Sequence, residues 1–177
     1  MKAIKYFFEF ISVISLFCIF KIIGLKNASC LGSLIGKYFG PLFRSDNITK
    51  QNIKIGLGEL EKTKETEIIK GMWSNIGRTF AEYTYLKDFK FNKTSIPHMQ
   101  IKGAKYLEEI KKNNHAVIFY SGHFANFELM AMELDKFGIK CAAIYRPLNN
   151  FFLNPLMEYL RMKYICPNQI PKGRMGM

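Results

Sequence analysis

Residues 116–128 read AVIFYSGHFANFE, and this stretch decides the predicted fold. Its first part, Ala116–Tyr120, is a short apolar run with β-branched and aromatic side chains, which is typical of a buried strand. A serine and a glycine end the run, and His123 follows at once. We therefore expect a buried strand that places a histidine at its end.

The segments after this stretch continue an alternation of helix and strand. The pattern predicts a helix over Phe124–Phe137, closed by Gly138, and a second strand over Ile139–Tyr145. Strand, helix and strand within about 30 residues form a βαβ unit with parallel strands. Asn154 is a good N-cap for a further helix, and Ile165 is expected to start a third strand. The fold class predicted for this part is α/β, with a mainly parallel sheet.

The alternating pattern stops within PKGRMGM, at the end of the sequence. A sheet of two or three parallel strands would leave apolar faces and an edge without neighbours. We therefore expect residues 44–177 to form an incomplete α/β domain whose C-terminal part is missing.

Residues 1–43 are expected to anchor the chain in a membrane. Their uninterrupted apolar core, Phe10–Phe20, is only eleven residues long. Crossing a bilayer takes roughly 20 residues, so a span would include Glu9 and Lys21 near its ends. The same pattern is also compatible with a helix that lies in the membrane interface. A cleaved signal sequence and a buried core helix are the alternatives.

A second helix is expected after this run. Four small residues recur there at every fourth position: Ala28, Gly32, Gly36 and Gly40. On a helix they form one face that allows very close contact with a neighbouring helix. This pattern suits a membrane-embedded hairpin with the first helix, and equally any tightly packed helix pair.

The composition limits the kinds of partner. The chain has 177 residues and is 49% hydrophobic and 15% aromatic, which excludes a disordered protein. Lys and Arg exceed Asp and Glu by 26 to 14, a net charge of +12 that favours an anionic partner. These basic residues do not form a nucleic-acid-binding motif. Together with the apolar N-terminus, the charge indicates a membrane partner and no nucleic acid.

Metal and disulfide chemistry are not expected. The four cysteines contain no C-x-x-C pair, and we interpret them as small buried side chains in a reducing compartment: Cys18, Cys30, Cys141 and Cys166. The chain has only three histidines, which argues against a multi-histidine metal site. We therefore expect neither a metal nor another cofactor.

The strand ends predict a reactive centre. His123 and Arg146 each follow an expected strand, so parallel strands would bring them to the same edge of the sheet. Glu128 would lie in the second turn of the following helix and lean back toward the imidazole. Such a carboxylate can orient a histidine that acts as general base on a hydroxyl attacking an acyl thioester. The helix N-terminus or Arg146 could stabilise the resulting oxyanion.

Direct transfer is favoured over an acyl-enzyme, because the G-x-S-x-G motif of a serine nucleophile is absent from the sequence. The alternative is a structural histidine and a solvated arginine. Lys172 and Arg174, on either side of Gly173, could hold a phosphate or belong to a solvated basic tail.

At these residues the chain resembles a known family. The H-x4-E motif in HFANFE, after an apolar strand, resembles the signature of the H-x4-D/E acyltransferases. More narrowly, the chain is similar to the lipid A biosynthesis lauroyl and myristoyl acyltransferases. Four further blocks carry this similarity in order: the MKxxxYFFEF-type start, NIGRTFAEY at Asn75–Tyr83, IYRPLNN at Ile144–Asn150, and IPKGRMG near the end.

The resemblance implies a single-pass inner-membrane enzyme whose catalytic domain faces the cytoplasm. It would move a fatty acyl chain from acyl carrier protein to a hydroxyl of the Kdo-bearing lipid A precursor, a phosphorylated glycolipid. His123 and Glu128 would be the catalytic pair. Arg146 would bind substrate, with Asn126 and Asn150 nearby.

Two departures from the family stand out. Ala125 and Phe127 replace the glycine and tryptophan that members usually carry inside the motif. Members are also usually longer, which agrees with the expectation of a missing C-terminal part and puts the activity of this form in question. The remaining alternatives are a glycerolipid or glycolipid acyltransferase of the same superfamily, and an inactive membrane-anchored lipid-binding fragment.

Overall fold

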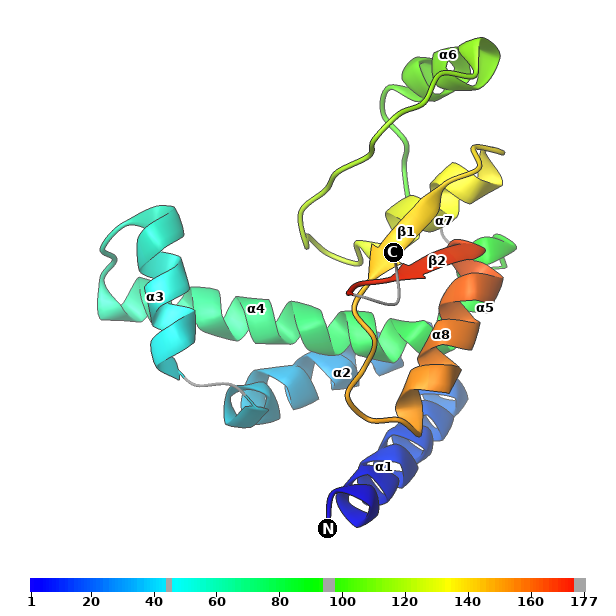
Figure 1. Ribbon diagram of the computed structural model, residues 1–177. Helices are drawn as coiled ribbons and strands as arrows, with labels where there is room; N and C mark the ends of the chain where they lie inside the picture. The colour runs from blue at the N-terminus through cyan, green and yellow to red at the C-terminus, as the bar shows by residue number, and fades with distance from the viewer. Residues whose placement is uncertain (44–45, 94–97, 174–177) are drawn as a thin grey trace. The chain divides into compact units, whose positions relative to one another are not determined.

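The computed structural model describes residues 1–43, 46–93 and 98–173, so the predicted phosphate contact of Arg174 lies outside it. The described chain is mostly helical (Figure 1). Its α-helices are α1 (Lys2–Ile23), α2 (Leu25–Phe39), α3 (Asp46–Leu57), α4 (Lys62–Glu82), α5 (Leu86–Lys90), α6 (Ala104–Asn113), α7 (Glu128–Lys136) and α8 (Leu153–Tyr164). Short 3-10 helices cover Gly40–Phe43 and Tyr83–Tyr85, and the strands are β1 (Ala142–Tyr145) and β2 (Asn168–Pro171).

The chain packs into two units. One is Leu16–Thr84, and the other combines Met1–Ser15 with Tyr85–Met177. Helix α1 therefore contributes residues to both units. The predicted division into an anchor (1–43) and a catalytic domain (44–177) is a functional one and stays a prediction.

In the Leu16–Thr84 unit, α2 and α4 lie side by side (Figure 1). The small face of α2 meets α4 at Gly77, where the two backbones approach so closely that no Cβ fits at Gly32, Gly36 or Gly77. The close helix contact predicted from the glycine spacing is thus confirmed. The suggested partner was wrong, because the glycine face packs on α4 and not on α1.

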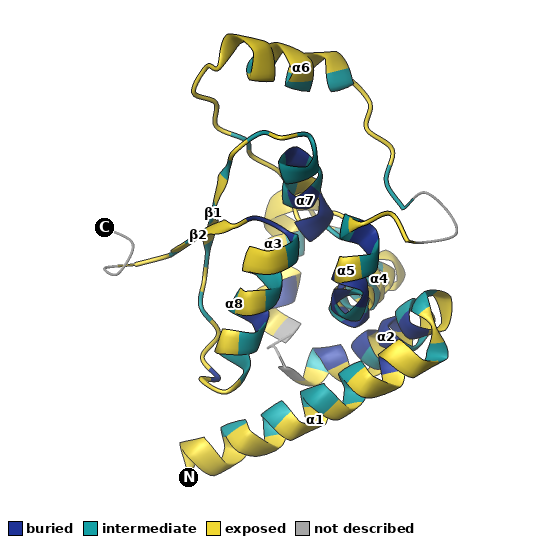
Figure 2. Cartoon of the chain, turned by 90° about the vertical axis from the view of Figure 1, so that its right-hand side faces the viewer, coloured by how far each residue is buried: buried dark blue, intermediate teal, exposed yellow. Residues whose placement is uncertain are grey.

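Helix α1 is the one helix, among the residues described, that is long and apolar enough to cross a membrane. A signal sequence near an N-terminus meets the same criteria of length and composition. Little of the helix is buried, as Figure 2 shows along its length. Its first turns carry Tyr6, Phe7 and Phe10, whose rings contact those of Phe151 and Phe152 in the other part of the same unit.

A parallel strand pair organises the second unit. β1 pairs with β2 in the register Ala142↔Asn168 to Tyr145↔Pro171, and α8 connects them. This β1–α8–β2 segment is a βαβ unit, and it corresponds to the second predicted strand, the helix predicted after Asn154 and the third predicted strand. The earlier βαβ unit, predicted to begin at Ala116, does not form. A two-stranded sheet replaces the larger sheet that we expected within these residues.

The strand that we expected over Ala116–Tyr120 does not form. The structure gives it no strand hydrogen bonding, and it leaves Ile118 90% and Tyr120 94% exposed. An apolar run becomes a strand only when a neighbouring strand satisfies its backbone N–H and C=O groups. In the described chain β1 pairs with β2 alone, so the run stays extended and unpaired with any strand.

Helix α7 begins later than predicted, but it ends where the sequence predicted. It begins at Glu128 and not near Phe124. Gly138 adopts a φ of 82°, donates to the Asp135 carbonyl, and is followed by Ile139 N–H donating to the Leu134 carbonyl, a Schellman C-cap. Without a Cβ, glycine takes this left-handed conformation at little cost, which fixes the helix end.

Candidate functional site

His123 lies in the loop before α7 and is exposed to solvent. Its ring packs on that of Phe127, with centroids 4.4 Å apart and planes inclined at 58°. The imidazole is therefore in contact with an aromatic side chain while the residue stays exposed to solvent. An exposed, oriented imidazole is what a general base for a bulky lipid substrate requires.

A tight turn separates His123 from the helix. Ala125 adopts a left-handed φ of 45°, which is uncommon for a residue with a Cβ. The carbonyls of Asn126 and Phe127 then accept the N–H groups of Leu129 and Met130. This turn places Glu128 at the first residue of α7, one turn earlier than predicted.

The Glu128 carboxylate is held by an arginine that the sequence analysis did not select. Arg161, on α8, donates to Glu128 Oε1 from Nη2 at 2.6 Å and from Nε at 3.2 Å. The two side chains are 21% and 10% exposed, respectively. The two hydrogen bonds fix the position of the carboxylate in this sheltered place.

The spacing of charged residues in the sequence does not indicate that Arg161 pairs with Glu128. On a helix, an arginine pairs most simply with an acid three or four residues away, and Glu158 stands at that distance. In the structure Glu158 accepts a hydrogen bond from the Tyr145 hydroxyl at 2.6 Å, which raises the pKa of that tyrosine. Glu158 is thereby tied to β1. The partner of Arg161 lies 33 residues away, where no sequence period can reveal it.

Two predicted substrate-binding cations meet at one end of the strand pair. Arg146 follows β1 and Lys172 follows β2, and the Lys172 N–H donates to the Tyr145 carbonyl at 2.7 Å. Both residues are exposed. The carboxyl ends of parallel strands are where open α/β folds bind ligands. The meeting of His123 and Arg146 at one sheet edge was predicted through the strand Ala116–Tyr120, which does not form, so that route to the site was wrong.

Asn150 is buried, and its side chain is fully engaged within the protein. Its Oδ1 accepts the N–H groups of Phe152 and Leu153 at the start of α8. Its Nδ2 donates to the Tyr6 carbonyl at 2.9 Å and to Glu9 Oε2 at 3.0 Å, both on α1. Asn150, and not Asn154, therefore caps α8. Its predicted role near the substrate stays a prediction.

Comparison with known proteins gives the class and then the family. The family model described as bacterial lipid A biosynthesis acyltransferase matches residues 1–165, which span every candidate site residue except Lys172 and Arg174. The chain is thus an acyltransferase. It belongs to the bacterial lipid A biosynthesis acyltransferase family, as its sequence motifs predicted. No curated protein and no solved structure matches it.

Proposed function

We propose that this acyltransferase moves a fatty acyl chain from acyl carrier protein to a hydroxyl of the Kdo-bearing lipid A precursor. The observation that carries the proposal is the placement of His123, exposed and packed on Phe127, in the loop that leads into a helix whose first residue is Glu128. The family match supports lipid A biosynthesis as the setting.

His123 is the general base in this proposal. It takes the proton of the acceptor hydroxyl as the oxygen attacks the thioester carbonyl, and it returns that proton to the leaving thiolate. Glu128 orients the imidazole and stabilises the imidazolium. Arg161 fixes the Glu128 carboxylate at the start of α7. The positive end of the α7 dipole, or Arg146, stabilises the oxyanion.

The acceptor's phosphate groups would bind the cations that follow the two strands. Arg146 and Lys172 are exposed and leave β1 and β2 side by side, which suits an anionic headgroup. We assign Arg174, next in this basic segment, to the same role. Asn126, in the turn before α7, and Asn150 would border the bound substrate.

We propose that the protein acts at the cytoplasmic face of the inner membrane, with residues 1–43 as its anchor. Helix α1 supports membrane association through its length and apolar composition. The net charge of +12 suits two acidic partners, acyl carrier protein and anionic lipid. No metal or other cofactor enters the proposed reaction.

Acyl transfer by the full chain in detergent tests the proposal. Acyl-loaded carrier protein is supplied with the Kdo-bearing precursor, and mass spectrometry identifies the acylated product. His123→Ala should lower the rate by about 10²-fold or more, because proton transfer is lost. His115→Ala, another exposed histidine in the same loop, is the matched control and should keep the wild-type rate.

Three outcomes would contradict the proposal. Undiminished transfer by His123→Ala would remove the general base. A wild-type product acylated on a glycerolipid, with no lipid A product, would favour the sister activity of the superfamily. A chain that binds lipid but transfers nothing would favour a lipid-binding fragment.

A further inference from the structure

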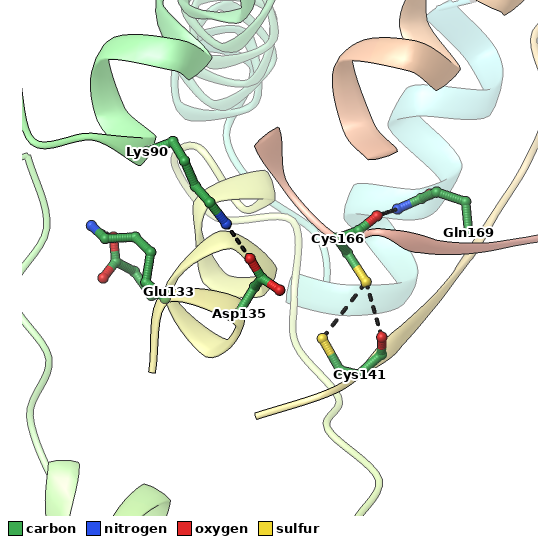
Figure 3. A network of polar contacts seen from close by, with 7 residues as sticks. Lys90, Glu133, Asp135, Cys141, Cys166 and Gln169 are labelled. Atoms are coloured by element: carbon green, nitrogen blue, oxygen red, sulfur yellow. Dashed lines mark hydrogen bonds and ion pairs between the residues drawn. The ribbon is translucent and has the colours of Figure 1, made fainter. Parts of the chain in front are cut away.

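Two cysteines that are distant in the sequence meet beside the strand pair. The Sγ atoms of Cys141 and Cys166 lie 3.7 Å apart, as Figure 3 shows. Cys141 directly precedes β1, and Cys166 lies two residues before β2. The parallel register brings the starts of the strands together, and with them the two thiols.

The site around Cys166 is well defined. This residue is fully buried, and its thiol lies 3.2 Å from the Cys141 carbonyl and 3.5 Å from that of Asn168. The Gln169 side chain donates to the Cys166 carbonyl at 2.9 Å, which fixes the backbone at this point (Figure 3). Cys141 is only half-buried. One thiol is therefore accessible and its neighbour is sheltered.

We propose that Cys141 and Cys166 form a dithiol modification site, which a peroxide closes to an intrachain disulfide and a trivalent arsenical bridges. Closing the sulfur atoms from 3.7 Å to bonding distance requires a movement of roughly 1.7 Å. Rotation of the two Cys side chains about their Cα–Cβ bonds covers such a distance. This proposal departs from the expectation that the cysteines have no disulfide chemistry. The expectation that all four are buried is wrong for Cys18 and Cys30, which are exposed.

The oxidation balances without any group from the protein besides the thiols. The Cys141 thiolate attacks one oxygen of hydrogen peroxide, and hydroxide leaves, giving a sulfenic acid. The Cys166 sulfur then attacks the Cys141 sulfur, and water leaves. In sum, two thiols and one peroxide give one disulfide and two waters. For the arsenical, two thiols and one arsine oxide give a dithioarsenite and one water.

The electrostatic surroundings of Cys141 make the peroxide reaction pH-dependent. Burial, the hydrogen bond with Cys166 and the nearby Asp135 carboxylate raise the pKa of Cys141 to about 11. Asp135 itself is ion-paired with Lys90 on α5 (Figure 3). Because the thiolate is the reactive form, the rate at neutral pH is low and rises with pH up to that value.

The test uses the full chain in detergent with the two exposed cysteines removed by Cys18→Ser and Cys30→Ser. Phenylarsine oxide at one equivalent should add one phenylarsenic group and block both remaining thiols. Hydrogen peroxide should remove two hydrogen atoms from the mass, and peptide mapping should join Cys141 to Cys166. Adding Cys141→Ser or Cys166→Ser should abolish both products.

A second measurement separates the site from accidental oxidation. Asp135→Asn should increase the rate of disulfide formation near neutral pH, because the thiolate of Cys141 is no longer opposed by that carboxylate. Three results would overturn the proposal. They are a linkage only between chains, a sulfinic acid on Cys141 with Cys166 still free, and no arsenical bound at one equivalent.

Discussion

Arg161 donates two hydrogen bonds to a single oxygen of Glu128, across 33 residues of sequence. The pair joins the first residue of α7 to the last turn of α8. Because Glu128 follows the turn that carries His123, the same pair also defines where the loop of the proposed general base ends. The Glu128 carboxylate is thus held by a residue of the βαβ unit and lies next to the loop of the proposed general base.

Replacing Arg161 with Met should destabilise the protein and lower acyl transfer. Loss of one partner leaves a sheltered carboxylate without its cation, and for such a partly buried pair we expect about 2 kcal/mol less free energy of unfolding. Chemical denaturation in detergent measures this. Lys163→Met, an exposed substitution on the same helix, is the control.

A double-mutant cycle with Glu128→Gln isolates the pair. If Arg161 acts through Glu128, the two substitutions together should cost much less than the sum of their separate effects, in stability and in transfer rate alike. Additive losses would show that Arg161 acts elsewhere.

Replacing Asn150 with Ala should act on stability before it acts on substrate binding. The side chain caps α8 and donates to two oxygens of α1, so its loss removes a cap and leaves acceptors unsatisfied. We expect a loss of about 2 kcal/mol in the free energy of unfolding. Asn149→Ala, at the exposed neighbouring position, should be close to neutral. A raised KM with unchanged stability would instead establish Asn150 as a substrate contact.

The elements that local patterns define were predicted best. The glycine face of α2, the Gly138 cap of α7 and the apolar α1 depend on neighbours within a few residues of sequence, and the structure has all three. The run Ala116–Tyr120 failed as a strand because pairing depends on a partner that no local pattern specifies. The sequence shows a composition there that is typical of strands, but it does not show which strand would supply the hydrogen bonds.

In the site, too, local features could be predicted and long-range contacts could not. The loop position of His123 and the helical position of Glu128 follow from the Gly-His turn and the apolar spacing after it. The sequence could not indicate Arg161 as the partner of Glu128, because the acid nearest to Arg161 in sequence is Glu158. Only the structure shows that Glu158 instead accepts a hydrogen bond from Tyr145. Long-range polar pairs of this kind arise from packing, which a single sequence does not display.

Replacing Gly77 with Ala should strongly destabilise the α2–α4 pair. A Cβ at this position would come within 2.8 Å of the Gly32 carbonyl carbon and 3.0 Å of the Gly36 Cα, both of which are backbone atoms. Separating the helices to admit it should cost about 2–3 kcal/mol of unfolding free energy. Gly71→Ala in the same helix meets open space and should stabilise by up to about 1 kcal/mol. Equal effects of the two substitutions on the denaturation midpoint would refute the close contact.

Replacing Ala125 with Gly should stabilise the turn before α7. A residue with a Cβ at a φ of 45° carries a conformational cost of about 1 kcal/mol, which glycine avoids. The expected gain in the free energy of unfolding is of that order, less the entropy that glycine adds to the unfolded chain. Ala131→Gly, inside α7, should destabilise by about 0.5–1 kcal/mol. Destabilisation by both changes would mean that the turn does not need a left-handed residue.

His98 should make the protein less stable in mild acid. Its side chain is largely buried, with its ring 4.6 Å from that of Phe89. Burial and the Lys136 charge lower the pKa of His98 below its ordinary 6.5, while Glu133, 3.8 Å from Nε2, opposes them. As the pH falls through 6.5, the unfolded chain therefore takes up a proton before the folded chain does. The contribution of the neutral histidine is complete above that pH and is lost progressively below it.

His98→Gln cannot titrate, so its free energy of unfolding should fall less steeply than that of the wild type as the pH is lowered from about 7.5 to about 5. Exposed His115→Gln should follow the wild-type curve. Glu133→Gln removes the one charge that favours the protonated ring and should steepen the loss in acid, provided that His98 is intact. A pH dependence that is the same in His98→Gln and in the wild type would show that the folded protein protonates His98 as easily as the unfolded chain does.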